Sequence, residues 1–213
     1  LMDRLLIGGS DDPLLAAAAT HLAAQLGADA LVALSPTGTR LGLDLLARRR
    51  INVCGIHWGP AEASAAAHVE LVREYPASAD WTLVRMALRE QGVMLAPRHA
   101  GAPDLATLVS REPRWAMRQD GAGSQRFIRS TLRERGIPYE SLVVAQTAYS
   151  ERQVAALIAQ GTVECAPGAA SAAREFGLAF LPLGWEAFDL AVPRAVFFRT
   201  LFQRLLETLR SDA

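Results

Sequence analysis

The chain contains no lysine, so arginine supplies all 22 basic residues of its 213-residue sequence. They are balanced by 22 acidic residues, which leaves a formal net charge of zero at pH 7. A domain that binds nucleic acid through its phosphates is usually basic, and this class of protein is therefore not indicated. Arginine is, in addition, the better partner for an oxyanion, because its planar guanidinium can donate two parallel hydrogen bonds.

Cysteine is almost as scarce as lysine. Cys54 and Cys165 are too few for a disulfide framework and form no C-x-x-C pair, so reduced thiols in a cytoplasmic protein are predicted. The histidines are not spaced in the sequence so that they could bind a metal ion together with other possible ligand residues, so no metal site is predicted. No apolar run approaches the roughly 20 residues that span a bilayer, and no membrane segment is expected. The opening residues, 1–4, lead straight into a predicted strand, so no signal peptide is predicted within this sequence.

Short apolar runs alternate with helix-like segments along the whole chain, and Gly, Ser, Thr or Asp mark most of the junctions. This alternation predicts an α/β fold built on parallel strands with helical crossovers. In the first part of the chain, strands are expected at 4–10, 30–34 and 51–56, and helices at 13–27 and 41–50.

The same pattern continues in the second part of the chain. A final amphipathic helix at 196–209 carries an apolar stripe formed by Phe197, Leu201, Leu205 and Leu209. The remaining expected strands are 81–88 and 93–96, separated by a turn at 89–92, then 115–117, 142–145, 162–165, 180–183 and 190–192. The remaining expected helices are 104–110, 123–135, 150–159 and a segment that ends near Gly177, after Ala/Gly turn residues that follow the strand 162–165.

Two segments resemble each other. Residues 50–56 and 161–167 each place a short strand after a helix, with a cysteine near the carboxyl end of the strand. Two similar α/β halves would produce this similarity, and so would any two unrelated α/β units.

A set of short motifs occurs in one order along nearly the whole chain: Gly9–Pro13, Gly38–Leu43, Gly55–His57, Arg89–Gly92, Arg118–Ser124, Phe180–Leu183 and Phe188–Pro193. In this set the chain resembles the substrate-binding-protein-like (PBP-like) domain family related to periplasmic molybdate-binding proteins. That family provides ligand-sensing domains of bacterial transcriptional regulators and is fused to molybdenum-cofactor enzymes.

The resemblance implies a type II periplasmic-binding-protein-like fold. Two α/β lobes would be joined by two crossover strands, with the ligand held in a cleft between the lobes. Residues 1–85 plus 189–213 would form lobe 1, and residues 90–184 would form lobe 2. Arg89 and Glu90 would belong to the crossover, where a structural ion pair or a hinge contact is expected.

Candidate ligand-binding residues lie where strands lead into helices. The free backbone N–H groups and the positive dipole end of a helix N-terminus attract anions. Each junction can also be explained as a helix cap. The cap is preferred for Asp12 because Pro13 follows it, and ligand binding is preferred for Gly121–Ser124 because a cap does not require two glycines. His57 and Arg118 stand at strand ends, as ligand-binding or structural residues. The candidates are Ser10, Asp11, Thr37, Gly38, Thr39, His57, Arg118, Gly121, Gly123, Ser124 and Ser150.

Two residues at the glycine-rich junction depart from the family pattern, Asp120 in place of a basic residue and Ala122 in place of a serine. A carboxylate beside the junction opposes an anion and suits an amine or hydroxyl donor. The ligand is therefore expected to be a small anion, such as a molybdate- or tungstate-like oxyanion, or alternatively a small polar organic metabolite.

Catalysis is not predicted. Cys54 and His57 would lie on opposite faces of a strand, because side chains alternate along it, and no other nucleophile–base pair is evident. The glycines at 121 and 123 lack the full dinucleotide fingerprint, and no cofactor is expected. The predicted function is a non-catalytic sensor domain, which would reach DNA only through a helix-turn-helix domain upstream of this chain and would form a homodimer.

Overall fold

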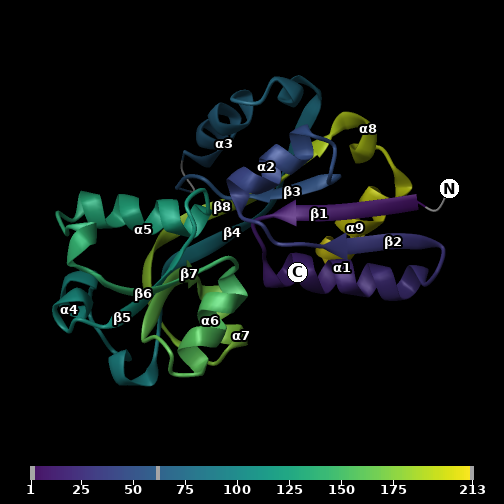
Figure 1. Cartoon of the computed structure of the whole chain (residues 1–213). Helices are drawn as coiled ribbons and strands as arrows, with labels where there is room; N and C mark the ends of the chain where they lie inside the picture. Colours follow the sequence, from purple (N-terminus) through teal and green to yellow (C-terminus); the bar gives the residue numbers. More distant parts are fainter. Residues whose placement is uncertain (1–2, 61–62, 212–213) are drawn as a thin grey trace. The chain divides into compact units, whose positions relative to one another are not determined.

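The computed structural model describes residues 3–60 and 63–211, so Leu1, Met2 and the last two residues lie outside the description. The predicted α/β class is confirmed, since helices and strands alternate along the chain (Figure 1). The chain divides into two compact units. Residues 1–87 and 187–213 form unit 1, and residues 88–186 form unit 2. The hydrogen-bonded strand order is β2-β1-β3-β8-β4-β7-β5-β6.

Unit 1 is built on three parallel strands and one antiparallel strand. β1 pairs in parallel with β2 and β3, and β3 pairs antiparallel with β8. The elements of unit 1 are β1 (Asp3–Gly9), α1 (Pro13–Leu26), β2 (Ala30–Leu34), α2 (Thr39–Ala47), β3 (Val53–Ile56), α3 (Ser64–Arg73), η1 (Pro76–Asp80), the start of β4 (Trp81–Leu95), the end of β8 (Ala179–Pro193), α8 (Arg194–Phe197) and α9 (Thr200–Ser211).

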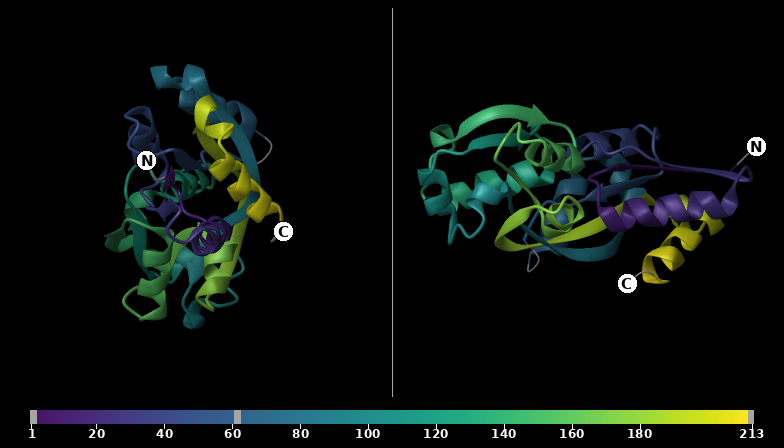
Figure 2. Two further views of the ribbon diagram at one scale, coloured as in Figure 1. Left: turned by 90° about the vertical axis from the view of Figure 1, so that its right-hand side faces the viewer. Right: turned by 90° about the horizontal axis from the view of Figure 1, so that it is seen from below.

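Helices cover both faces of the unit 1 strands. On one face α1 and α9 lie side by side, as the two views of Figure 2 show, and bury Leu15, Leu22 and Leu205 against β1 and β8. On the other face α2 and α3 bury Leu43 and Leu71 against β3. The predicted apolar stripe of the last helix is therefore part of the main core of unit 1.

Unit 2 has the same layered construction. Apolar side chains of α4 and α5 form one cluster with Trp115 and Met117 of β5, and those of α6 and α7 form a second cluster with Ala116. Figure 1 shows these four helices around the strands of unit 2. The elements of unit 2 are the end of β4, η2 (Pro97–His99), α4 (Leu105–Ser110), β5 (Arg114–Arg118), α5 (Gly123–Glu134), η3 (Tyr139–Ser141), β6 (Val143–Ala148), α6 (Glu151–Ala159), β7 (Cys165–Ala169), α7 (Ala170–Glu175) and the start of β8.

Two predicted strand breaks are wrong. β4 runs unbroken from Trp81 to Leu95 through the expected turn at 89–92, and β8 joins the two strands that were expected at 180–183 and 190–192. Gly92 explains the first error. A Cβ atom there would lie 2.0 Å from the carbonyl oxygen of Leu181, so glycine allows close backbone contact at this position and forms no turn.

The position of β7 also differs from the prediction. The strand begins at Cys165, where the predicted strand 162–165 ends, so the expected Ala/Gly turn is itself the strand. Its residues are small because β7 is covered on both faces. A Cβ atom on Gly168 would lie 2.7 Å from Cε of Met94. Cys165 is consequently the first residue of its strand and not the last. A separate difference concerns the expected last helix at 196–209, which is divided into α8 and α9.

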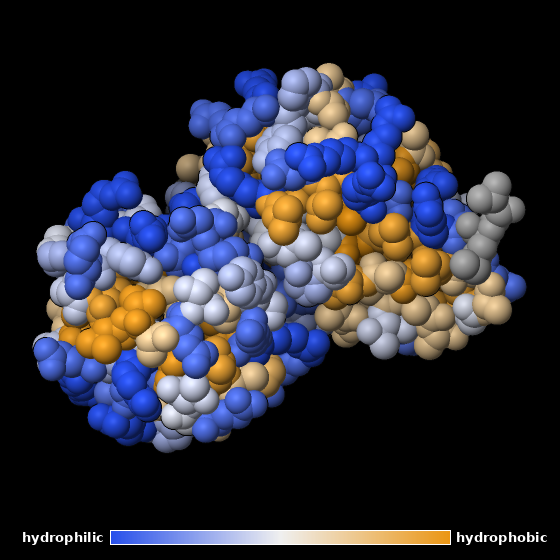
Figure 3. Space-filling view, in the orientation of Figure 1, coloured by the Kyte–Doolittle hydropathy of each residue, from blue (hydrophilic) through white to orange (hydrophobic). Residues whose placement is uncertain are grey.

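Among the residues that the structure describes, no helix is both long and apolar enough to cross a bilayer. Each unit does expose some apolar side chains. In unit 1 Leu31 of β2 is exposed, and in unit 2 Val143 and Val144 of β6 are exposed. Figure 3 shows apolar, orange areas on the surface of both units. β2 and β6 are the first and last strands in the strand order.

Candidate functional site

The carboxyl ends of three neighbouring strands in unit 1 bring together most of its predicted site residues. The N–H of Ser10, just after β1, donates to the carbonyl oxygen of Gly55 in β3 at 2.8 Å. The N–H groups of Thr37 and Gly38, after β2, both donate to the carbonyl oxygen of Gly9, at 2.9 and 3.0 Å. Ser10, Thr37 and Gly38 therefore lie at one edge, as their positions in the sequence predict.

Hydroxyl groups connect these strand ends. Oγ of Ser10 and Oγ1 of Thr39 lie 2.8 Å apart, and both side chains are buried. Oγ1 of Thr39 also accepts from the N–H of His57 at 3.4 Å, and Oγ1 of Thr37 accepts from the N–H of Gly9 at 3.0 Å. We call Ser10, Asp11, Thr37, Gly38, Thr39 and His57 the unit 1 cluster.

Glycines hold the backbone of the unit 1 cluster tightly. A Cβ atom on Gly42 of α2 would lie 2.3 Å from Cα of Gly9, and one on Gly55 would lie 2.5 Å from the carbonyl oxygen of Ser10. The start of α2 therefore rests directly on the end of β1. The ring of His57, which is buried, stacks on Phe188 with centroids 6.4 Å apart.

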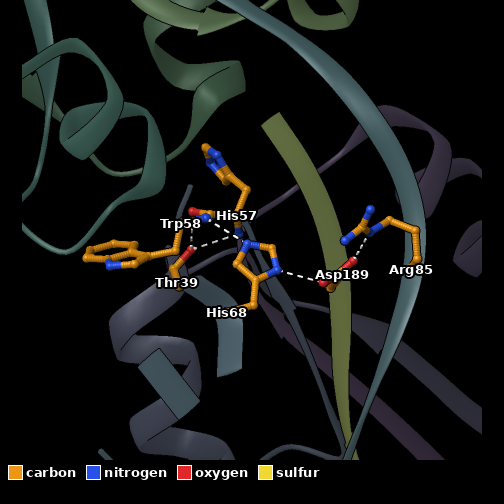
Figure 4. Close-up of polar contacts among 6 residues, drawn as sticks. All are labelled: Thr39, His57, Trp58, His68, Arg85 and Asp189. Atoms are coloured by element: carbon orange, nitrogen blue, oxygen red, sulfur yellow. Dashed lines mark hydrogen bonds and ion pairs between the residues drawn. The ribbon is translucent and has the colours of Figure 1, made fainter. Parts of the chain in front are cut away.

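The structure adds a polar network that the sequence did not suggest (Figure 4). Nδ1 of His68 lies 2.6 Å from Oδ2 of Asp189, and Nε2 of His68 accepts from the N–H of Trp58 at 3.0 Å. Arg85 donates through Nε to Oδ1 of Asp189 at 2.5 Å. Because Nε2 is an acceptor, the proton of the neutral ring is on Nδ1 and points at the carboxylate.

The His68 and Asp189 side chains of this network are buried, Arg85 reaches Asp189 from an exposed position, and the network is electrostatically favourable. Burial alone would raise the pKa of Asp189, but the hydrogen bonds from His68 and Arg85 outweigh it, so the pKa of this carboxyl lies below its usual value. His68 and Asp189 are 121 residues apart in the sequence, and although Asp189 lies in the motif Phe188–Pro193, His68 lies in none of the motifs. No spacing rule could have paired them. The network fixes the backbone just after β3, next to His57.

In unit 2 a buried arginine joins two strand–helix junctions. Arg118, the last residue of β5, is 5% exposed. Its NH2 group donates to the carbonyl oxygen of Tyr149, just before Ser150, at 3.3 Å, and its backbone N–H donates to the side-chain oxygen of Gln125 at 3.1 Å. The structure thus brings the glycine-rich junction and the start of α6 together, and places Arg118 between them.

The four helix starts differ in one respect that distinguishes a cap from an open anion site. The side chain of Asp12 caps α1 by accepting from the N–H groups of Leu14 and Leu15, and Oγ of Ser150 caps α6 by accepting from the N–H of Gln153 at 3.0 Å. The helices α2 and α5 follow Gly38 and Ala122, and neither residue makes a side-chain cap. Asp12 is thus a cap, as predicted, and Ser150 acts as one too.

The glycine-rich junction itself turns sharply into α5. Gly121 has φ of +84°, a conformation that favours glycine, and Gly123 is the first residue of the helix. Ser124 follows in the first turn and is 0% exposed. Among the residues that the structure describes, its Oγ has no hydrogen-bond partner. We call Arg118, Gly121, Gly123, Ser124 and Ser150 the unit 2 cluster.

Asp120 does not point into this junction. Its side chain is 92% exposed and lies 3.8 Å from the guanidinium of Arg129. The carboxylate is therefore screened by water and by a neighbouring cation. The expectation that Asp120 opposes an anion at the junction stays a prediction, and the exposure of its side chain and the nearby Arg129 indicate that the effect of its charge is small.

Two further polar groups of β4 are buried in unit 2. Arg89 forms an ion pair, as the crossover prediction allowed, but its partner is Glu151 of α6, at 3.7 Å, and not the adjacent Glu90. Gln91 is 0% exposed, and neither atom of its side-chain amide has a partner among the described residues. Buried amides are nearly always hydrogen-bonded, so Gln91 is unusual.

The two thiols are inert in this setting. Burial raises the pKa of Cys54 and of Cys165 well above the usual value for a thiol, so neither is a thiolate at neutral pH. Within residues 3–60 and 63–211, no three His, Cys, Asp or Glu side chains are grouped so that they could hold a metal ion.

The profile of the PBP superfamily domain matches residues 19–210. No curated protein matches the sequence. Among solved structures, the tungstate ABC transporter of Geobacter sulfurreducens is similar with a TM-score of 0.70 and 12% identity, over 99% of this chain and 98% of that one.

Two further solved structures are similar over nearly their whole length. The effector-binding domain of QuiR in complex with shikimate has a TM-score of 0.65 and 11% identity, over 98% of this chain and 96% of that one. A phosphate-bound substrate-binding protein assigned to a phosphate ABC transporter of Clostridium perfringens has a TM-score of 0.64 and 10% identity, over 97% and 93%. The predicted periplasmic-binding-protein-like fold is thereby confirmed.

Proposed function

We propose that this chain, which belongs to the PBP superfamily domain family, is a non-catalytic domain that binds a small anion, such as a molybdate- or tungstate-like oxyanion. Of the four helix starts that carry candidate residues, those of α2 and α5 have no side-chain cap in the described structure, and this observation carries the proposal together with the polar side chains beside them. The starts of α3, α7 and α8 also lack such a cap but carry none of the candidate residues. Uncapped N–H groups at a helix N-terminus attract anions, because they add to the positive end of the helix dipole.

Both uncapped starts are accompanied by suitable side chains. At α2 the buried hydroxyls of Ser10 and Thr39 adjoin the helix start, and at α5 the hydroxyl of Ser124 and the guanidinium of Arg118 do so. Charged hydrogen bonds of this kind are stronger than neutral ones. The neighbouring structures with bound phosphate and the tungstate transporter support an oxyanion as the first ligand class to test.

Calorimetric titration of the ligand-free protein with molybdate, tungstate, sulfate and phosphate tests the proposal. Heat that saturates at one ion per chain is expected for at least one of them. Repeating the titration with Thr39→Val and with Ser124→Ala shows which cluster holds the ion, since each variant removes one hydroxyl of one cluster. Sodium chloride at equal ionic strength is the control, and no saturable heat with any of the four ions contradicts the oxyanion assignment.

A small polar organic metabolite is the second candidate ligand. Gln91 favours it, because its buried amide presents an acceptor oxygen as well as donors, and a fully deprotonated oxyanion can satisfy only the donors. The shikimate complex of QuiR shows that this fold accommodates such a ligand in another protein. A thermal-shift screen of small hydroxy and amino acids separates the candidates, since a true ligand raises the melting temperature.

The same proposal includes the kind of protein in which the domain works and its oligomeric state. The resemblance to regulator sensor domains, together with the QuiR effector-binding domain among the similar structures, supports a cytoplasmic sensor of a transcriptional regulator that works as a homodimer. DNA would then be bound by a separate helix-turn-helix segment. The gene sequence upstream of this chain and the mass of the protein in solution test these two statements.

A further inference from the structure

Several buried polar groups of unit 2 have no hydrogen-bond partner among the described residues, and they include the side-chain amide of Gln91 and Oγ of Ser124, besides Nε1 of Trp115 and Oγ of Ser171. Gln91 and Ser124 are both 0% exposed. A buried polar group without a partner destabilises the fold, so such groups are rare unless a water or a ligand satisfies them. Gln91 is the stronger case, because it lacks partners for its donor and for its acceptor.

The two groups lie on the same side of the strands of unit 2. Gln91 alternates along β4 with Val93 and Leu95, so these three side chains share one face. Ser124 precedes Ile128 and Leu132 by four and eight residues on α5, so these three share one helix stripe. Val93, Leu95, Ile128 and Leu132 belong to one apolar cluster, which places both polar groups at its border.

The strand register puts the two groups at the same edge of that face. Gln91 pairs with Ala169, the last residue of β7. β7 runs parallel to β5, with Cys165 opposite Trp115, so the end of β7 lies level with the end of β5. α5 begins a few residues after the end of β5. Gln91 and the first turn of α5 are therefore neighbours at one end of the sheet.

The charges at this edge favour an anion. Two ion pairs, Arg89 with Glu151 and Arg126 with Glu186, balance one another, and Arg118 adds a third guanidinium. The half-buried Glu90 and the exposed Asp120 also stand close by in the sequence, so the attraction for an anion depends on the buried guanidinium of Arg118 and on the uncapped start of α5, which contributes the positive end of a helix dipole.

From this geometry we infer that Gln91 and Ser124 select an anion that retains an O–H group, because the acceptor oxygen of Gln91 needs a donor from the ligand. The inference rests on the proposed anion-binding function and narrows its ligand. An oxyanion without hydrogen would leave this buried oxygen unsatisfied, whereas a hydroxycarboxylate or a protonated oxyanion bonds to it while its negative oxygens accept from Ser124 and the start of α5.

Matched ligand pairs test the inference on the whole chain by calorimetry. Lactate differs from propionate only by its hydroxyl, and phosphate differs from sulfate by keeping a hydrogen at neutral pH. The wild type is expected to bind the member with the O–H at least about 10-fold more tightly in one of the pairs. The lactate arm identifies a hydroxycarboxylate, and the phosphate arm identifies a protonated oxyanion.

The variant Gln91→Met tests the inference a second time, through its ligand preference and its melting temperature. Methionine keeps the length of the side chain and removes its amide, so the preference within the pair should fall to within about 2-fold. The ligand-free variant should melt about 2–4 °C higher, because an unsatisfied buried amide has been removed. Gln160→Met makes the same change at the exposed end of α6 and should alter neither quantity.

The outcomes separate the inference from the proposed function. If the wild type binds sulfate, molybdate or tungstate as tightly as the ligands that carry an O–H, or if Gln91→Met keeps the preference, the inference is wrong and anion binding stands. If the wild type binds none of these anions, both statements are wrong.

Discussion

His68 and Asp189 form a buried hydrogen bond in which Nδ1 and Oδ2 are 2.6 Å apart, and Arg85 donates to the other oxygen of the same carboxylate. The imidazole also accepts from the N–H of Trp58, so one histidine links β8 to the segment that follows β3. An aspartate beside a histidine is a common arrangement in hydrolases, but here the second ring nitrogen is already occupied by a backbone donor. The pair therefore holds the backbone in place and is not set up to take a proton from a substrate.

The variant Asp189→Asn should lower the free energy of unfolding at neutral pH by about 2–3 kcal/mol, because it removes the charge from two hydrogen bonds. Urea unfolding measures this change. Asp29→Asn, at an exposed position after α1, is the control and should stay within about 0.5 kcal/mol of the wild type. A change at Asp189 no larger than that at Asp29 contradicts the prediction.

The same carboxylate predicts how stability depends on acid. Its pKa is lower in the folded protein than in the unfolded chain, whose value is near 3.8, so its contribution is present above that pH and is lost as the pH falls through the folded pKa. Between about pH 5 and pH 2 the free energy of unfolding should therefore fall more steeply for the wild type than for Asp189→Asn. Parallel acid limbs in the two proteins would show that Asp189 has an ordinary pKa.

Arg118 and Asp120 should differ sharply in their effect on anion binding. Arg118→Gln removes a buried charge from the unit 2 cluster and should weaken binding about 10- to 100-fold, the range expected for a charged hydrogen bond. Asp120→Asn should change the affinity by less than about 2-fold, because its side chain is 92% exposed. Titration of both variants with the anion that the wild type binds gives the comparison, and a tighter complex with Asp120→Asn would show that the carboxylate does repel the ligand.

Gly42 should not tolerate alanine, although it lies inside a helix. Alanine at such a position usually stabilises a helix by about 1 kcal/mol. Here its Cβ would lie 2.3 Å from Cα of Gly9, so Gly42→Ala should instead cost about 1–3 kcal/mol. Gly184→Ala is the matched control, because the nearest atom to its Cβ would be 3.7 Å away on Phe127. Thermal unfolding of both variants decides the sign.

Both cysteines should resist alkylation in the folded protein. Cys54 and Cys165 are buried, and burial raises the pKa of each thiol, so little thiolate is present and reagents cannot reach it. Iodoacetamide at about pH 8 should leave the native protein unmodified and should add two groups after unfolding in urea. Mass spectrometry measures this, and rapid modification of the native protein would show that one thiol is accessible.

The sequence was most informative where local chemistry decides the structure. Asp12 and Pro13 indicate the start of α1, and the helix begins at Pro13 with Asp12 as its predicted cap. The strand ends of unit 1 also come together as expected, because parallel strands place their carboxyl ends at one edge. These features depend on residues that are close in the chain, or on a strand order that an α/β alternation favours.

Other features depend on distant contacts that a single sequence does not reveal. Gly92 could mark a turn or a close approach of two backbones, and only the position of Leu181 decides between them. The small residues of β7 looked like a turn for the same reason. The partners of Asp189, and the missing partners of Gln91, are likewise properties of the folded chain and not of any local pattern.

Unit 2 is one uninterrupted stretch of chain, whereas unit 1 is assembled from both ends of the sequence. The core of unit 1 includes Phe188, Leu190 and the buried face of α9, which lie within the last 26 residues, from 188 to 213. During translation the ribosome therefore releases a complete unit 2 before unit 1 has all its core residues, although unit 1 begins first. On this chain the inserted unit can fold first, whereas the N-terminal strands, which α1, α2 and α3 cover only in part, complete their core when β8 and α9 emerge.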